Sequence, residues 1–260
     1  MESLLPERQF SQKWHIKGLL TVVLVILILF GSGQMTGVST DFSWDQFWQI
    51  LIKMTQPDWS YVSAIVTPIL ETIQMALVGT LLGTIIAVPF SLLAARNIMK
   101  NAVARGIIRF FLNLVRALPD LLLAAFFVAI VGIGPMAGVG ALTVFSFGMI
   151  SKLFYEAIET IDDGPIEALT AAGANSIQTI VFAVVPQVFN QFLSYFLYTL
   201  EINVRASTVL GYLGAGGVGL YLSQTLSLFR YDRTAIVILA ILVVVIIVDG
   251  ISNRLREALA

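Results

Sequence analysis

Long intervals without Asp, Glu, Lys or Arg dominate this sequence. A helix that crosses the hydrocarbon core of a bilayer needs about 20 mostly apolar residues. Six stretches of roughly this kind can be traced: Leu19–Phe30, Thr72–Ala95, Phe110–Val131, Val139–Tyr155, Ile177–Leu200 and Thr234–Val248. Of the 260 residues, 58% are apolar and only 12% are charged, which does not fit a water-soluble globular domain. The pattern predicts an all-α integral membrane protein with about six transmembrane helices.

The third and fourth stretches come from one interval, Leu121 to Ser151, that contains no charged residue. It is too long for one crossing. The sequence Gly132-Ile-Gly-Pro135 inside it breaks a helix, because proline has no amide hydrogen and glycine favours turns. We therefore predict two spans with a turn at these residues.

The first stretch also allows interpretation as a signal peptide. Arg8, Lys13 and Lys17 precede its 12-residue apolar core, and Gly31-Ser-Gly33 follows it. The small residues do not form an Ala-x-Ala site, and a chain with five later spans can insert without cleavage. An uncleaved first helix is the preferred interpretation.

Basic residues predict the orientation in the membrane. With the N-terminus inside, 11 of the 15 lie on the cytoplasmic side: Arg8, Lys13, Lys17, Arg96, Lys100, Arg105, Arg109, Arg116, Lys152, Arg254 and Arg256. We therefore expect both termini to be cytoplasmic. The outside loop, residues 34–68, contains Trp44, Trp48, Trp59 and Tyr61 and is predicted to lie at the headgroup level. This divides the chain into residues 1–67, with the tail, first helix and interfacial loop, and a transmembrane domain over residues 68–256.

Several kinds of chemistry are excluded by residue type. There is no cysteine, and His15 is the single histidine, so thiolate and histidine-ligated metal sites are not expected. A net charge of -1 argues against a nucleic-acid surface. The run Gly214–Gly219, GAGGVG, matches a dinucleotide fingerprint but lacks its strand–helix context, and no P-loop motif is present. We expect no cofactor on this chain and no ATPase activity of its own.

The loop between the fourth and fifth spans is acidic. Its carboxylates are Glu156, Glu159, Asp162, Asp163 and Glu167, against one base, Lys152. Glu167 begins a short helix-forming run of small residues that Gly173 closes, as a C-cap glycine would. Such a helix allows another protein to approach closely, and its carboxylates can meet basic groups there. A solvated acidic loop is the alternative.

This segment resembles the cytoplasmic signature of ABC-importer permeases, Glu-Ala-Ala, three residues, Gly, nine residues, Ile-x-Leu-Pro. Glu167, Ala168, Gly173 and Pro186 match at the required spacing, while Leu169, Ala183 and Val185 are apolar replacements. The resemblance implies that the loop, about residues 156–176 and including Ala171 and Ala172, forms a coupling helix. In that family it sits in a groove of a separate ATPase subunit, which binds ATP and Mg²⁺.

The segment Ala206–Phe229 is uncharged, yet Gly211, Gly214, Gly216, Gly217 and Gly219 fall within nine residues of it. Irregular backbone at membrane depth is tolerated only where protein or a water-filled cavity covers it. We therefore predict a non-spanning or re-entrant segment.

Residues 201–219 indicate which group of ABC permeases the chain resembles. The string from Glu201 through Asn203, Arg205 and Val209-Leu-Gly211 to GAGGVG is similar to phosphonate-type ABC permeases, as is the ending Asp249 to Arg256. The resemblance covers about residues 68–256. It implies a type I importer (MetI-like) fold in a bacterial plasma membrane and a homodimer of permeases with two ATPase subunits. It also implies an extracytoplasmic binding protein that delivers phosphonate, phosphite or phosphate.

Other functions stay open as alternatives. Permeases for methionine or other small solutes share the coupling loop. An ion-coupled secondary carrier would normally show an internal repeat and charged residues in mid-span, and neither is visible. A membrane-embedded enzyme has only Ser151 beside Lys152 as a nucleophile pair, and adjacent helical residues do not face each other.

The fifth span carries a polar stripe. Gln187, Gln191, Ser194 and Tyr198 recur at i, i+4, i+7 and i+11, which places them on one helical face. The stripe either lines a translocation path or hydrogen-bonds neighbouring helices; the weakness of interhelical polar contacts favours the path. Arg205, just beyond the stripe, could meet an oxyanion, but its spacing from Glu201 favours an ion pair.

Two further patterns concern helix geometry. Pro186 is expected to bend the fifth span near its cytoplasmic end. Gly79, Gly83 and Ala87 form a row of small residues that predicts close helix packing.

Overall fold

The structure is a computed structural model, and it describes residues 18, 20–28, 31 and 43–259. It divides into two units, residues 1–49 and 50–260, and each is considered by itself. In the first unit residues 20–28 are helical, within the predicted first span; Leu19, Leu29 and Phe30 and the preceding basic residues lie outside the described residues. The helices in chain order are α2 (Trp44–Met54), η1 (Trp59–Tyr61), α3 (Val62–Ala94), α4 (Ala102–Arg116), α5 (Asp120–Val131), α6 (Pro135–Ile158), α7 (Gly164–Ala171), α8 (Ser176–Thr179), η2 (Ile180–Val184), α9 (Val185–Tyr212), α10 (Val218–Ser227) and α11 (Tyr231–Leu259).

The described residues are helical without any strand, as predicted, and they contain several helices suited to a bilayer. Four are long and apolar enough to cross it: Trp59–Ala94, Pro135–Ile158, Ser176–Tyr212 and Tyr231–Leu259. A fifth arises if α4 and α5 together count as one bent span. These five correspond to the spans predicted after Leu19–Phe30. The division of the chain at residue 68 stays a prediction.

The predicted span over Phe110–Val131 is not one straight helix but a sharply bent pair, α4 and α5. The chain breaks after Arg116, and α4 meets α5 at 84°. Pro119 is the reason, because it cannot donate a helical hydrogen bond and it disfavours helical geometry at the residue before it. The next break is where the sequence placed it: Gly132 ends α5 with φ +95°, and Pro135 starts α6.

Three helices run past the ends of their predicted spans. α3 begins ten residues before Thr72, α9 continues to Tyr212, and α11 continues through Asp249 to Leu259. Because the spans were predicted as intervals without charged residues, the predicted spans end at Glu71, Glu201 and Asp249. A helix can continue beyond such a residue when the charge is paired or reaches water.

The centre of the larger unit is the contact between α3 and α6. A Cβ atom built on Gly79 would lie 2.6 Å from Cβ of Leu142, and one on Gly83 would lie 2.5 Å from Cβ of Ser146. Ala87 is fully buried. The small residues therefore let the two helices approach closely, which confirms the predicted packing row.

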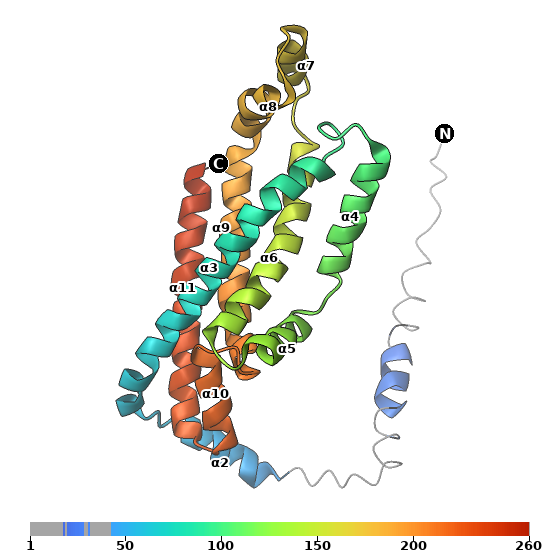
Figure 1. Cartoon of the computed structure of the whole chain (residues 1–260). Coiled ribbons are helices and arrows are strands. Elements are labelled where there is room, and N and C mark those ends of the chain that lie inside the picture. The colour runs from blue at the N-terminus through green and yellow to red at the C-terminus, as the bar shows by residue number, and fades with distance from the viewer. Residues whose placement is uncertain (1–17, 19, 29–30, 32–42, 260) are drawn as a thin grey trace, which may run out of the picture. The chain divides into compact units, whose positions relative to one another are not determined.

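The glycine-rich turn after α9 is covered by protein. Ala215 and the glycines around it are buried, and a Cβ on Gly219 would lie 1.9 Å from the carbonyl oxygen of Thr208. The turn therefore folds α10 tightly back on α9, and Figure 1 shows this hairpin beside α11. At 1.5 Å per residue the ten residues of α10 extend about 15 Å, too short to cross a bilayer. The non-spanning prediction is confirmed.

Candidate functional site

The predicted coupling residues gather on α7 and just after it. Figure 1 shows α7 and α8 at the end of the helical bundle opposite α10. No residue of α7 is buried, and Glu167, Ala168, Ala171, Ala172 and Gly173 are all exposed. Ile166 holds α7 against the bundle by packing on the cluster around Phe154. The result is a short helix that contacts the bundle through Ile166 and exposes its small residues and one carboxylate, that of Glu167.

Gly173 closes α7 as predicted. Its φ is +85°, a left-handed conformation that glycine adopts readily. Its N–H donates to the Thr170 carbonyl at 3.0 Å, and the Ala174 N–H donates to the Leu169 carbonyl at 2.9 Å. This pair of bonds is a Schellman motif, so the last carbonyls of α7 are satisfied at the point where the chain turns back.

Two of the five loop carboxylates form ion pairs within the chain, and a third, that of Asp162, accepts the Gly164 N–H at 2.9 Å. Glu159 pairs with the Arg109 guanidinium and accepts the Arg96 N–H at 2.7 Å, and only 15% of its side chain is exposed. Arg109 also donates to the Ala94 carbonyl at 2.9 Å. Glu156 pairs with Lys152 at 2.5 Å. The carboxylates of Asp162, Asp163 and Glu167 remain on the exposed surface.

Glu159 therefore fixes the base of the predicted coupling loop to the end of α3 and to the middle of α4. Sequence reasoning placed it among the carboxylates for a partner. The spacing in sequence gave no sign of its internal role, because Arg109 lies 50 residues away.

The other side of the loop is tied to α9 by Gln187. Its Oε1 accepts the Asp162 N–H at 3.1 Å, and its Nε2 donates to the Asp162 and Ala183 carbonyls at 3.3 and 2.8 Å. The preceding Pro186 follows the π-helical turn η2. A proline cannot donate to the turn before it, and this irregular turn lies where the sequence predicted a bend. Gln187 and Pro186 thus join the loop to the long helix.

The rest of the polar stripe lies on the surface of the chain. Gln191 and Tyr198 are exposed and Ser194 is half-buried. Gln191 donates to the Tyr195 hydroxyl at 2.8 Å and Ser194 donates to the Asn190 carbonyl at 2.9 Å, both within α9. Within the described chain these side chains make no hydrogen bond to another helix, so packing inside one copy does not account for them. Their role in a path stays a prediction.

The opposite face of α9 carries a buried polar cluster that sequence reasoning missed. Asn203 donates from Nδ2 to Oγ1 of Thr80 at 2.7 Å and to Oγ of Ser146 at 2.6 Å, and all three residues are fully buried. The bonds join α9 to α3 and α6. A signal was available: polar residues beside the small-residue row are candidates for interhelical bonds.

Arg205 forms the ion pair that its spacing favoured. Its Nη2 contacts Oε1 of Glu201, and Arg256 from α11 contacts the other oxygen of Glu201 at 2.9 Å. The Glu201 side chain is 9% exposed, whereas that of Arg205 is 54% exposed. One buried carboxylate therefore holds two guanidinium groups and links α9 to α11.

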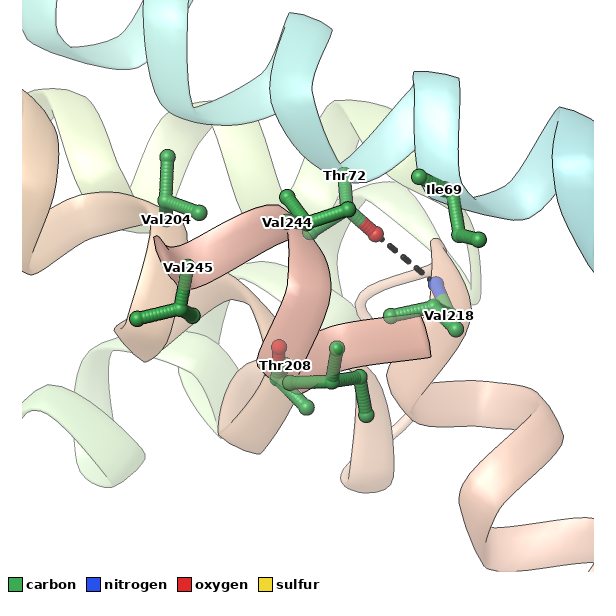
Figure 2. A pocket seen from close by; sticks show the side chains of 8 residues that line it. Ile69, Thr72, Val204, Thr208, Val218, Val244 and Val245 are labelled. Atoms are coloured by element: carbon green, nitrogen blue, oxygen red, sulfur yellow. Dashed lines mark hydrogen bonds between the residues drawn. The ribbon is translucent and has the colours of Figure 1, made fainter. Parts of the chain in front are cut away.

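The pocket in Figure 2 is a gap between packed helices. It offers about 10 Å³, space for one water molecule at most. Its only polar groups are Thr72 and Thr208, and the Thr72 hydroxyl already accepts the Val218 N–H at 2.8 Å and donates to the Pro68 carbonyl at 2.9 Å. It is unsuited to a charged solute.

A larger pocket, of about 240 Å³, lies at the corner between α4 and α5. Its lining residues are Val115, Arg116, Leu118, Leu123, Phe145 and Met149.

A metal site is not indicated: no group of three or more His, Asp or Glu side chains that could hold an ion occurs within the described residues.

Comparisons with known proteins agree on one family. Residues 87–259 match the family described as binding-protein-dependent transport system inner membrane component. The phosphite transport system permease protein PtxC of Stutzerimonas stutzeri is 40% identical over 201 residues, 77% of this chain and 73% of that protein. The phosphate-import permease protein PhnE of Mycolicibacterium smegmatis is 40% identical over 189 residues, 73% of this chain and 36% of its own length.

A solved structure has the same fold. It is an inward-facing form of the MetNI methionine ABC transporter, in which the matched chain has a TM-score of 0.69 at 25% identity. The match covers 78% of this chain and 99% of that one.

Proposed function

Because this chain belongs to the family of binding-protein-dependent transport system inner membrane components, we propose that it carries an oxyanion of the phosphonate, phosphite or phosphate class across the membrane. It is a multi-pass permease subunit of an ABC importer in the inner membrane, a transport subunit and not an enzyme. The oxyanion class rests on one observation: relatives that are 40% identical are permeases for phosphite and phosphate.

The methionine alternative has weaker support. The methionine transporter has the same fold, but its identity to this chain is 25%. A shared fold does not determine the substrate, which depends on the side chains of the path.

We assign the connection with the ATPase to α7. Its exposed small residues let a groove on the ATPase subunit close around the helix, and the carboxylates of Asp162, Asp163 and Glu167 can meet basic groups there. ATP and Mg²⁺ would be bound by that partner. In this arrangement the α7 end and both termini face the cytoplasm, and the α10 end faces the extracytoplasmic binding protein.

The loop is attached so that movement of α7 reaches the bundle on two sides. Glu159 connects it to Arg109 and to the end of α3, and Gln187 connects it to α9. A displacement of α7 by the ATPase therefore acts on both ends of the loop at once. Ion pairs and hydrogen bonds of this kind provide a contiguous route for coupling.

The full transporter in this proposal contains two copies of the permease and two ATPase subunits. Gln191, Ser194 and Tyr198 of each copy would line the path between the copies. The exposed Gln191 amide and Tyr198 hydroxyl can donate hydrogen bonds to an oxyanion without holding it as long as a full positive charge would.

The test is transport by the purified complex in proteoliposomes. We expect ATP hydrolysis and uptake to rise when the binding protein is added with phosphite, phosphate or methylphosphonate, and to stay at the basal level with methionine. Stimulation by methionine, with no response to the oxyanions, would contradict the substrate class. Absence of a co-purifying ATPase would contradict the importer assembly itself.

A further inference from the structure

Arg116, the last residue of α4, is an exposed arginine that lies beside the middle of α6. Within residues 43–259 its guanidinium donates no hydrogen bond that the structure contains and takes part in no ion pair. Arg109, on the same helix, pairs with Glu159, and Arg205 and Arg256 share Glu201. Asp120, four residues further on, forms no ion pair with Arg116. The charge of Arg116 is therefore left unbalanced by the part of the chain that the structure describes.

The packing of Arg116 gives its depth in the membrane. Its side-chain stem crosses α6 at Gly148, where a Cβ would lie 3.0 Å from Cγ of Arg116. Gly148 is ten residues before Ile158 and thirteen after Pro135, about 15 Å and 20 Å along a helix that is long enough to span the bilayer. Arg116, the last residue of α4, therefore lies beside the middle of a spanning helix, and not on the cytoplasmic side where the count of basic residues placed it.

Exposing an arginine to lipid at that depth is unfavourable in free energy. Insertion scales assign about 2.5–3.5 kcal/mol to an arginine at the centre of a spanning helix. Such residues usually face a water-filled cavity or a binding partner and mark the pathway of an ion or substrate. The side chain is exposed on this chain, so it is available to a group that the chain does not supply.

A pocket accompanies the charge. Arg116 is the charged residue in the lining of the 240 Å³ pocket, whose other members are apolar. The 84° bend between α4 and α5 places the end of α4 there, so the charge stands at a corner instead of along a straight helix. The combination of an apolar wall with one guanidinium suits a small oxyanion, because a guanidinium can hold two oxygens at once.

We propose that Arg116, and not Arg205, is the cationic contact for the transported oxyanion within the membrane. The proposal rests on the oxyanion importer function and adds the residue that contacts the anion in transit. Arg205 is already paired with a buried carboxylate, whereas Arg116 has its full donor set free.

The chain has no cysteine, so Arg116→Cys introduces its only thiol. Uptake is measured in proteoliposomes with saturating, phosphite-loaded binding protein. Loss of a charged hydrogen bond predicts an initial rate about 10- to 100-fold lower than that of the natural chain. Modification of the thiol with 2-aminoethyl methanethiosulfonate attaches a primary ammonium, which restores a positive charge with N–H donors and is expected to restore uptake. Modification with 2-sulfonatoethyl methanethiosulfonate adds a negative charge and is expected to leave uptake low. Phosphite is expected to slow the modification.

Two controls accompany the variant. The natural complex treated with both reagents reports on thiols of the partner subunits. Lys100→Cys removes a positive charge from the loop before α4 and is expected to leave uptake unchanged with or without the reagents.

The outcomes separate the proposals. Normal uptake by Arg116→Cys, or equal rescue by both reagents, overturns the role of Arg116 and leaves the importer function standing. Failure of phosphite to protect the thiol also overturns it. Dissociation of the permease pair on size-exclusion chromatography, with no rescue, assigns it to the second copy instead. If the natural complex imports no oxyanion, the proposed function itself fails.

Discussion

Replacing Gly173 tests whether the end of α7 is shaped for coupling. Gly173 has φ +85°, and a Cβ there would meet no atom within 4 Å. Gly173→Ala therefore changes the backbone energy without a clash inside the chain. A left-handed residue with a side chain costs about 1–2 kcal/mol, which shifts the equilibrium between the capped and the frayed end of α7 by a factor of about 5–30.

Asparagine separates this backbone effect from a steric one. Asparagine tolerates the left-handed conformation better than alanine although it is larger. We expect substrate-stimulated ATP hydrolysis in proteoliposomes to fall in the order Gly173, Gly173→Asn, Gly173→Ala. If asparagine were worse than alanine, the size of the side chain against the ATPase would be the cause, and the argument from backbone conformation would be refuted.

The control is Gly132→Ala at the end of α5. Gly132 has φ +95° with ψ 174°, a conformation that costs an alanine at least as much, and a Cβ there also meets no atom within 4 Å. It lies outside the coupling loop. We expect Gly132→Ala to lower thermal stability while stimulated hydrolysis per folded complex stays normal. Equal loss of stimulation in both variants would show that Gly173 acts through general stability.

Three further variants are checked by thermal unfolding in detergent. Gly83→Ala places a Cβ 2.5 Å from that of Ser146 and is expected to cost about 1–3 kcal/mol from overpacking, partly offset by helix propensity; a higher midpoint would contradict the close packing. Asn203→Ala removes two interhelical bonds and should cost about 0.6–1.7 kcal/mol, and an unchanged midpoint would show that they add nothing. Hydrogen bonding from Ser60, then Arg233, lowers the pKa of Asp58. Its stabilising effect is thus present above the pKa of the unfolded chain and is lost as pH falls through the lower folded value. The midpoint advantage over Asp58→Asn should therefore be present at about pH 7 and disappear once the pH falls below the lowered pKa of Asp58.

Elements whose signal is local could be predicted. The small-residue row of α3, the glycine that ends α7 and the break at Gly132 to Pro135 each follow from the backbone preferences of a few neighbouring residues. The covered glycine turn follows from the cost of exposed backbone in lipid.

Elements that depend on residues far apart could not be predicted in this way. Pro119 was visible in the sequence, but only the packing decides that a proline ends a span at a sharp corner instead of bending it slightly. Glu159 was assigned to a partner because its arginine lies 50 residues away. The Asn203 cluster joins residues 123 and 57 positions apart.

The sequence alone determined that this is a helical membrane protein with a short helix closed by Gly173 in an acidic loop, because apolar length and a glycine that ends a helix are properties of contiguous residues. The tertiary structure decided which charges are neutralised. Arg256 joins Arg205 on Glu201, whereas Arg116 has no partner among the described residues, because pairing between distant residues depends on distance in space and on burial, and neither can be read from spacing along the chain.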